Sequence, residues 1–463
     1  MKIKKIIKLF LAFIAISACS LEPKYERPKV EVPFKKSDES KLKTSKVYWK
    51  EFFQSPDLQR VIDLALENNR DLRVASLNIE SARAAHGVAQ SALLPSVSAT
   101  ALETRQGVPS AFAAFTPRRQ YRANISFAAY ELDFFGRLRN LKKSAFENYL
   151  ASEEAQITAR ISLIAEVANA YSQLLLDMEI LKITEENLAA QSDRYKFTEL
   201  RYKHGIASQS DLLNAQVIIE TAKTNREIYS KIVTQDKNAL MLLTGIFDDR
   251  SLPKNMTISD IKINENLLDF VPSESLLLRP DIQQAEHNLK SANANIGAAR
   301  AAFFPSITLT GTYGYGSRNL ANLFDSKTWA FTPQVNIPIF SGGKNIENLK
   351  IANLQKKVEI TQYEKAIQVA FREVLDQLAE RESVTNQVKS FTEILKARQK
   401  SYDIFQLKHK QGISSAMDIL DSKISLLSAR QNHANIAKEN IANLITLYKV
   451  LGGGSDVSEY VEK

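Results

Sequence analysis

Two long segments of this chain contain neither glycine nor proline, and the absence of these two residue types constrains the fold more than any other feature. Residues 137–204 and 344–411 each run for 68 residues without either type, and each segment ends at a lone glycine, Gly205 or Gly412. A further 39 residues free of both follow each glycine. Proline costs about 3 kcal/mol and glycine about 1 kcal/mol inside a helix. The sequence therefore predicts unbroken helices, and at 1.5 Å per residue 68 residues would extend over roughly 100 Å.

The two halves of the chain carry the same motifs in the same order. Residues 202–213 align with 409–420, and the helix-to-strand junction at Pro95 aligns with the junction at Pro305, 210 residues later. A period of about 210 residues is much longer than the unit of a solenoid protein. We therefore interpret the chain as a tandem duplication with two-fold pseudo-symmetry.

Each half is predicted to begin with a helix of about 24 residues, near 71–94 and 281–304, followed by strands. Residues 95–104, 121–130, 307–316 and 329–337 place apolar side chains at every second position. Strands of about ten residues are long enough to cross a bilayer in a tilted barrel, although the same alternation suits a soluble sheet with one wet face. Four strands cannot close a barrel, which needs about eight. If these strands lie in a membrane, the protein must oligomerise to pair their edges.

The long segments also carry the apolar repeat of a coiled coil. Apolar residues recur at alternating spacings of four and three within 157–178 and 360–374. This 3.5-residue period predicts supercoiled helices that pack side by side. After the first 18 residues no apolar run approaches the length that a transmembrane helix needs, so none is predicted.

The first residues have the pattern of a secretory signal. Four lysines precede the apolar run 9–18, and the small residues before Cys19, the only cysteine, resemble a bacterial lipobox. An ordinary signal peptide with an incidental cysteine is the alternative. We expect residues 1–18 to be removed and Cys19 to be acylated, which would leave the mature chain no internal disulfide.

Charge and composition argue against several classes of function. The formal net charge of +9 falls to about +5 without the four leader lysines, and no clustered basic face indicates nucleic-acid binding. The five histidines are scattered along predicted helices, and the sequence contains no phosphate-binding loop of the Walker type. We therefore expect no enzyme activity, no cofactor, no metal site and no nucleic-acid partner.

Four features together resemble the TolC-like outer-membrane efflux proteins. They are the duplicated unit, the strand exits at 130–137 and 338–343, the segment Arg279-Pro280-Asp281-Ile282, and the Pro95 and Pro305 junctions. The resemblance covers roughly residues 20–455, and Cys19 points to the lipoprotein branch of this family. It implies a mostly α fold with a β-barrel, in which a homotrimer builds a 12-stranded barrel in the bacterial outer membrane. A long coiled-coil α-barrel would extend into the periplasm.

The resemblance also implies a domain organisation and a function. The first repeat would span 71–245 and the second 281–451, while 19–70, 246–280 and the tail 452–463 would form the anchor, an equatorial region and its connector. The protein would be the passive exit duct of a tripartite efflux system. Its partners would be a periplasmic adaptor, an inner-membrane pump of the RND type, and outer-membrane lipid.

Two groups of residues are candidate functional sites. The turns between long helices match the family's tip motif, which meets the adaptor; their residues are Gly205, Ile206, Ser208, Gly412, Ile413 and Ser415. By position, Asp418 and Asp421 match the aspartates of the family's periplasmic gate. Three copies would gather six carboxylates, which attract cations and raise one another's pKa. A capping role is the alternative for Asp418, and His409 and Ser414 stand where the prototype has its gate-locking residues.

Two other functions fit the same sequence. One is the exit duct of a type I protein secretion system, which shares this architecture. The other is a lipid-anchored coiled-coil scaffold without a pore, which leaves the four alternating strands unexplained.

Overall fold

The computed structural model describes residues 20–28, 48–107, 109, 118–248, 250, 252–253, 256–267 and 273–453. These residues fall into two compact units, which are described separately. The first unit contains residues 20–28, Leu77–Glu154 and Gln283–Ala366. The second contains the described parts of Val32–Ser76, Ala155–Ile282 and Ile367–Lys463. The long helices therefore contribute residues to both units.

Helices form most of the described chain, as the missing glycines and prolines predict. The two long helices α5 (Arg137–Lys203) and α8 (Lys344–Lys410) each have 67 residues. The shorter α6 (Gln209–Thr244) and α9 (Ala416–Val450) follow them after the glycine turns. Each half begins with a 22-residue helix, α4 (Arg70–Ser91) or α7 (Pro280–Ala301). Two short helices, α2 (Trp49–Phe52) and α3 (Pro56–Asn68), precede α4.

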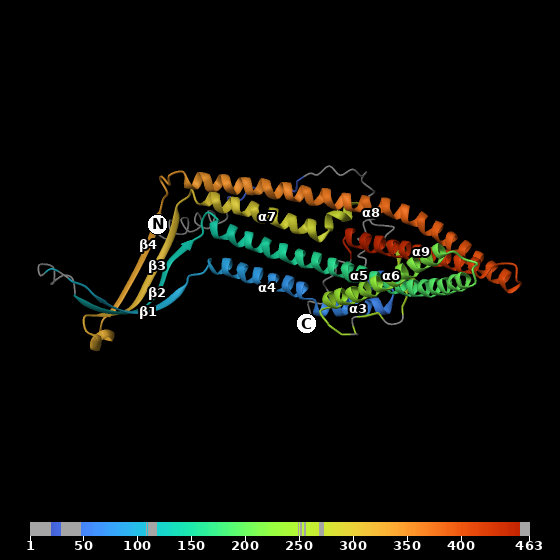
Figure 1. The fold of residues 1–463 in the computed structure, drawn as a ribbon. Coiled ribbons are helices and arrows are strands. Elements are labelled where there is room, and N and C mark those ends of the chain that lie inside the picture. The colour runs from blue at the N-terminus through green and yellow to red at the C-terminus, as the bar shows by residue number, and fades with distance from the viewer. Residues whose placement is uncertain are drawn as a thin grey trace. The chain divides into compact units, whose positions relative to one another are not determined.

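A four-stranded antiparallel sheet lies in the first unit, with the strands in sequence order (Figure 1). The strands are β1 (Val97–Arg105), β2 (Arg119–Leu132), β3 (Ser306–Ser317) and β4 (Lys327–Asn336). The central pair β2–β3 joins the two halves of the chain, for example at Ile125 opposite Tyr313. Within the described residues β1 and β4 are the edges of the sheet, and every residue of both edge strands is exposed. The predicted fold class, mostly α with four strands per chain, is confirmed.

The main hydrophobic core lies in the second unit. Phe52 and Phe53, around the end of α2, contact Tyr448 on α9, and the rings of Phe52 and Tyr448 stack with centroids 4.8 Å apart. Residues of the predicted coiled-coil seam, such as Ile164 and Tyr171 on α5, are buried in the same cluster. The seam therefore provides the packing surface that its 3.5-residue period predicts.

The segment 20–28 lies against helices of the first unit. Glu22 accepts hydrogen bonds from Lys143 on α5 and Asn293 on α7, both 2.9 Å long. Tyr25 and Arg27 both donate to the buried carboxylate of Glu286 on α7. Within the described residues, no helix is both long and apolar enough to cross a membrane.

Candidate functional site at the helix turns

Each turn between long helices contains a glycine in the left-handed conformation. Gly205 after α5 and Gly412 after α8 both have a φ of 72°, a region that residues with a Cβ disfavour. In both turns the amide of the residue after the glycine donates to the helix carbonyl five residues earlier, at 2.8 Å. The side chains at this next position point away from packed surface, and Ile206 is 67% and Ile413 70% exposed. The two tips of the second unit therefore each present one apolar residue.

A capping box begins the helix after each turn. Ser208 and Asp211 form it at α6, and Ser415 and Asp418 form it at α9. Asp418 Oδ2 accepts from the Ser415 amide and hydroxyl, both at 2.8 Å, while Ser415 Oγ accepts from the Asp418 amide at 3.2 Å. These hydrogen bonds from Ser415 lower the pKa of the Asp418 carboxyl. Within the chain, these hydrogen bonds oppose the rise in pKa that repulsion among gathered carboxylates would cause.

Asp421, the second candidate gate residue, has a different partner. Its Oδ1 accepts from Arg194 Nη1 on α5 at 2.9 Å, and the side chain stays about half exposed. Asp421 therefore links α9 to α5, whereas Asp418 is held within its own turn. The sequence does not indicate the role of Arg194, because 227 residues separate it from Asp421 and no local pattern relates the two.

His409 and Ser414, the two positions that depart from the family prototype, make local contacts in the second turn. The His409 ring, through Nδ1, is 2.9 Å from the Ser414 carbonyl oxygen, and Ser414 Oγ donates to the Phe405 carbonyl at 3.2 Å. Both interactions stay between the end of α8 and its own turn. They stabilise the shape of the tip rather than joining two long helices.

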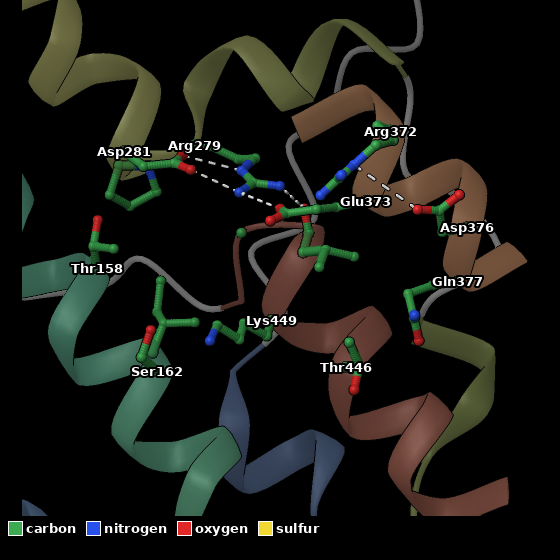
Figure 2. Close-up of a pocket in the computed structure, with 14 residues that line it drawn as sticks. Thr158, Ser162, Arg279, Asp281, Arg372, Glu373, Asp376, Gln377, Thr446 and Lys449 are labelled. Atoms are coloured by element: carbon green, nitrogen blue, oxygen red, sulfur yellow. Dashed lines mark hydrogen bonds and ion pairs between the residues drawn. The ribbon is translucent and has the colours of Figure 1, made fainter. Parts of the chain in front are cut away.

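The motif that begins the second half forms an ion network around the buried Arg279 in the second unit (Figure 2). Arg279 donates to both carboxylate oxygens of Asp281, at 3.0 and 2.7 Å, to Glu373 on α8 at 3.0 Å, and to the Val450 carbonyl at 2.7 Å. Burial alone would lower the pKa of Arg279, but these two carboxylates raise it above its ordinary value. The network borders a pocket of about 510 Å³. These acceptors hold the guanidinium of Arg279 in place. The network therefore braces α7, α8 and α9 and does not present Arg279 as a free charge.

The remaining predicted residue, Cys19, lies outside the described residues. Among the described residues, no group of three or more His, Cys, Asp and Glu side chains is placed to hold a metal ion.

Comparisons with known proteins agree with this architecture. A family model described as outer membrane efflux protein matches residues 61–246 and 271–453. The chain is 38% identical to the probable efflux pump outer membrane protein TtgC of Pseudomonas putida over 97% of this chain and 96% of that protein. It is 36% identical to the cation efflux system protein CusC of Escherichia coli over 96% of this chain and 98% of CusC. The open-state outer membrane channel MtrE of Neisseria gonorrhoeae has a TM-score of 0.82 at 36% identity, covering 95% of this chain and 99% of MtrE.

Fold and similarities together define an outer-membrane channel that serves efflux in bacteria. More specifically, the chain belongs to the outer membrane efflux protein family. The resemblance drawn from the sequence is confirmed, and so are the predicted function in efflux and the location in the bacterial outer membrane.

Proposed function

We propose that three copies of this chain form the passive exit duct of a tripartite efflux system. The observation that carries this proposal is the four-stranded sheet, whose edge strands β1 and β4 pair with no further strand in the described part of the chain. Its exposed side chains include Trp329, Phe331 and Val335 on β4. Unpaired, apolar strand edges are costly in water and in lipid. Twelve strands from three copies would close into a barrel without edges.

The duct needs no catalysis and no cofactor of its own. Solutes pass through it down their gradient, and energy comes from an inner-membrane pump, which we propose to be of the RND type. A periplasmic adaptor connects the two. The names of two relatives support this role, since TtgC is named a probable efflux pump outer membrane protein and CusC a cation efflux system protein.

We assign the adaptor contact to the two tips and the gate to the residues that follow the second tip. Ile206 and Ile413 are exposed apolar side chains on turns fixed by Gly205 and Gly412, which suits docking of a partner. Ser208 and Ser415 cap the helices that follow and hold the shape of each tip. Asp418 and Asp421 form the periplasmic gate, where carboxylates from three copies would attract cations.

Cys19 provides the lipid anchor in this proposal. The lipobox pattern carries the assignment, and the segment that follows it, 20–28, is fixed against α5 and α7. Cys19→Ser should abolish incorporation of labelled palmitate in growing cells, while Ser20→Ala should leave it unchanged. Continued labelling of Cys19→Ser would overturn the anchor.

Release of solute from vesicles tests the duct itself. Purified protein reconstituted into liposomes should release a small entrapped dye without any energy source or partner protein, and release should be faster for Asp418→Ala combined with Asp421→Ala. Liposomes with heat-denatured protein provide the control. Retention of the dye by both the native protein and the double variant would contradict a passive duct.

A further inference from the structure

The two faces of the four-stranded sheet differ in polarity. On one face the register places Ile125, Tyr313 and Trp329 in a row across β2, β3 and β4. All three side chains are more than half exposed. The opposite face carries mostly small polar side chains, such as Asn124 on β2 and Thr328 on β4. In an outer-membrane protein, an exposed apolar face of this kind contacts lipid.

The apolar face ends at a group of basic residues. Each strand joins a helix at one end, and the other ends of β1, β2 and β4 carry Arg105, Arg119 and Lys327. The pairing places Arg105 opposite Arg119, and Lys327 opposite Tyr315, all on the apolar face. From Lys327 to Ile337, just after β4, the chain extends about 33 Å, or about 25 Å along the membrane normal at a tilt of about 40°. The basic group therefore lies one apolar membrane thickness from the end of the sheet that joins the helices.

Two arginines in this group lie directly opposite each other. Like charges at the paired positions Arg105 and Arg119 repel. Glu103 offsets this repulsion, because its Oε1 accepts from Nε of both arginines at 2.5 Å. Among the described residues, Glu103 is the acidic side chain that pairs with either arginine, and the arginine side chains stay 68% and 52% exposed. The three residues thus hold two guanidinium groups together with one positive charge in excess.

Further positive charge lies at the same end of the sheet. Lys327 is exposed and has no ion-pair partner within the described part of the chain. Arg318, just after β3, is also exposed. Segment 103–122 contains four arginines and one glutamate, and segment 317–327 contains one arginine, one lysine and one aspartate. Each chain therefore carries an excess of four positive charges at this end of its sheet.

Aromatic rings accompany these charges. Tyr315 on β3 contacts Phe324 in the short helix η7 (Leu320–Asp325), with ring centroids 5.3 Å apart. The guanidinium carbon of Arg119 lies 4.9 Å from the centre of the Tyr121 ring. Aromatic and basic side chains together are typical of the level at which a membrane protein leaves the hydrocarbon and meets the lipid headgroups. This end of the sheet therefore has the composition of a headgroup contact.

Charges at the other end of the sheet are balanced instead. Arg137 donates to Glu131 at 2.5 Å, and Arg139 donates to Asp133 at 3.2 Å. Each of these arginines has a carboxylate of its own, so the two pairs are neutral. The excess positive charge thus lies at the end away from the periplasmic helices, which is the end that reaches the outer leaflet of the membrane.

We propose that Arg105, Arg119 and Lys327 bind the phosphate groups of lipid A, the glycolipid that anchors lipopolysaccharide in the outer leaflet. Lipid A carries phosphates on a disaccharide, and arginine matches phosphate with paired N–H donors. Its acyl chains lie on the apolar face, where a cavity of about 420 Å³ is lined by Tyr313 and Trp329 among others. The assignment rests on the proposed membrane barrel, and it adds which lipid is bound and by which side chains.

Native mass spectrometry in an uncharged detergent tests the site. Three lipids are compared: lipid A, lipid A stripped of its phosphates, and cardiolipin. The native protein should bind lipid A at least about tenfold more tightly than either of the others, and Arg105→Gln with Arg119→Gln should weaken lipid A binding about tenfold or more. Lys327→Gln should weaken it severalfold. Arg122→Gln is the matched control, because Arg122 lies on the polar face of β2 at the same level, so its loss should change nothing.

A charge-conserving variant separates charge from packing. Arg105→Lys with Arg119→Lys should retain most of the lipid A binding that the glutamine pair loses. Native-like binding by the glutamine pair, or equal binding of lipid A without phosphates, would overturn the site. Equal affinity for cardiolipin, or displacement of lipid A by inorganic phosphate alone, would mean a general anion site and would overturn the assignment to lipid A.

Conductance separates this site from the proposed duct. In planar bilayers of uncharged phospholipid, the native protein and the glutamine pair at Arg105 and Arg119 should give the same current, because neither arginine lies on the polar face of the sheet. Current from both proteins, with no preference of the native protein for lipid A, overturns the lipid site alone. Selective binding of lipid A by a protein that gives no current overturns the duct and leaves the lipid site standing.

Discussion

Arg194 on α5 and Asp421 on α9 form an ion pair of 2.9 Å within the second unit; in sequence, Asp421 lies close to the second tip and Arg194 close to the first. It fixes one of the two candidate gate residues to a neighbouring long helix. Asp418, three residues earlier, is instead bound to Ser415 in its own turn. Removing Asp421 should therefore have a different effect from removing Asp418.

Arg194→Gln should favour the open state of the periplasmic mouth. A partly exposed ion pair contributes about 0–1 kcal/mol, so its loss should shift the closed-to-open equilibrium by up to about fivefold. Single-channel recording in planar bilayers measures this as a higher open probability. Arg430→Gln is the matched control, because it breaks another 2.9 Å pair between α9 and α5, with Glu186. Equal effects of both variants would mean that the change is not specific to the gate.

Asp418→Ala separates charge from capping at the second tip. Loss of the cap should cost about 1 kcal/mol of stability, and loss of the carboxylate should reduce the preference for cations. Ser415→Ala removes the same cap and keeps the charge, so it should lower the melting temperature similarly without changing ion selectivity. Asp211→Ala in the first turn removes the equivalent capping box. If Ser415→Ala changes selectivity as much as Asp418→Ala does, then Asp418 acts only as a capping residue.

A carboxylate pair between α5 and α6 should make stability depend on pH. Asp177 is buried, and the buried Asp236 Oδ2 has no hydrogen-bond partner among the described residues. Burial and the neighbouring Asp177 raise the pKa of Asp236 to about 6. The folded state thus holds this proton more tightly than the unfolded chain does, so stability falls as pH rises from about 4 to about 6 and stays lower above that.

Asp236→Asn should remove this dependence by replacing the charge with a neutral group of the same shape. We expect a melting temperature a few degrees higher at pH 8 and nearly unchanged at pH 4. Asp193→Asn, at an exposed position of α5, should have little effect at either pH. A gain of the same size at both values of pH would contradict the carboxylate pair as its source.

Charges on the tips should impair efflux without closing the pore. Ile206→Asp and Ile413→Asp place carboxylates where an apolar contact with the adaptor is proposed, so resistance of cells to exported compounds should fall. Conductance in planar bilayers should stay the same, because both side chains are mostly exposed. Leu378→Asp, on an exposed face of α8, should leave resistance intact. Unchanged resistance with both tip variants would argue against docking at the turns.

Local sequence signals predict the secondary structure of this chain closely. Missing helix breakers predict α5 and α8, and apolar alternation predicts β1 to β4 within a few residues. The capping boxes at Ser208 and Ser415 are also local, because cap and partner are three residues apart. These features need no knowledge of tertiary structure.

Tertiary contacts between distant residues could not be predicted in the same way. Arg194 meets Asp421 and Asp177 meets Asp236 only because long helices happen to align these positions. The different burial of α4 and α7 is similarly hidden, since both helices have the same length and related sequences. It reflects which neighbours the fold provides and not the residues of the helices themselves.

Ion conductance through the purified protein in planar bilayers tests the passive duct most directly. The native protein should give small, cation-selective current steps without any partner, and Asp418→Ala with Asp421→Ala should give larger and less selective steps. The absence of current from both proteins, incorporated as intact oligomers, would contradict a pore formed by this chain.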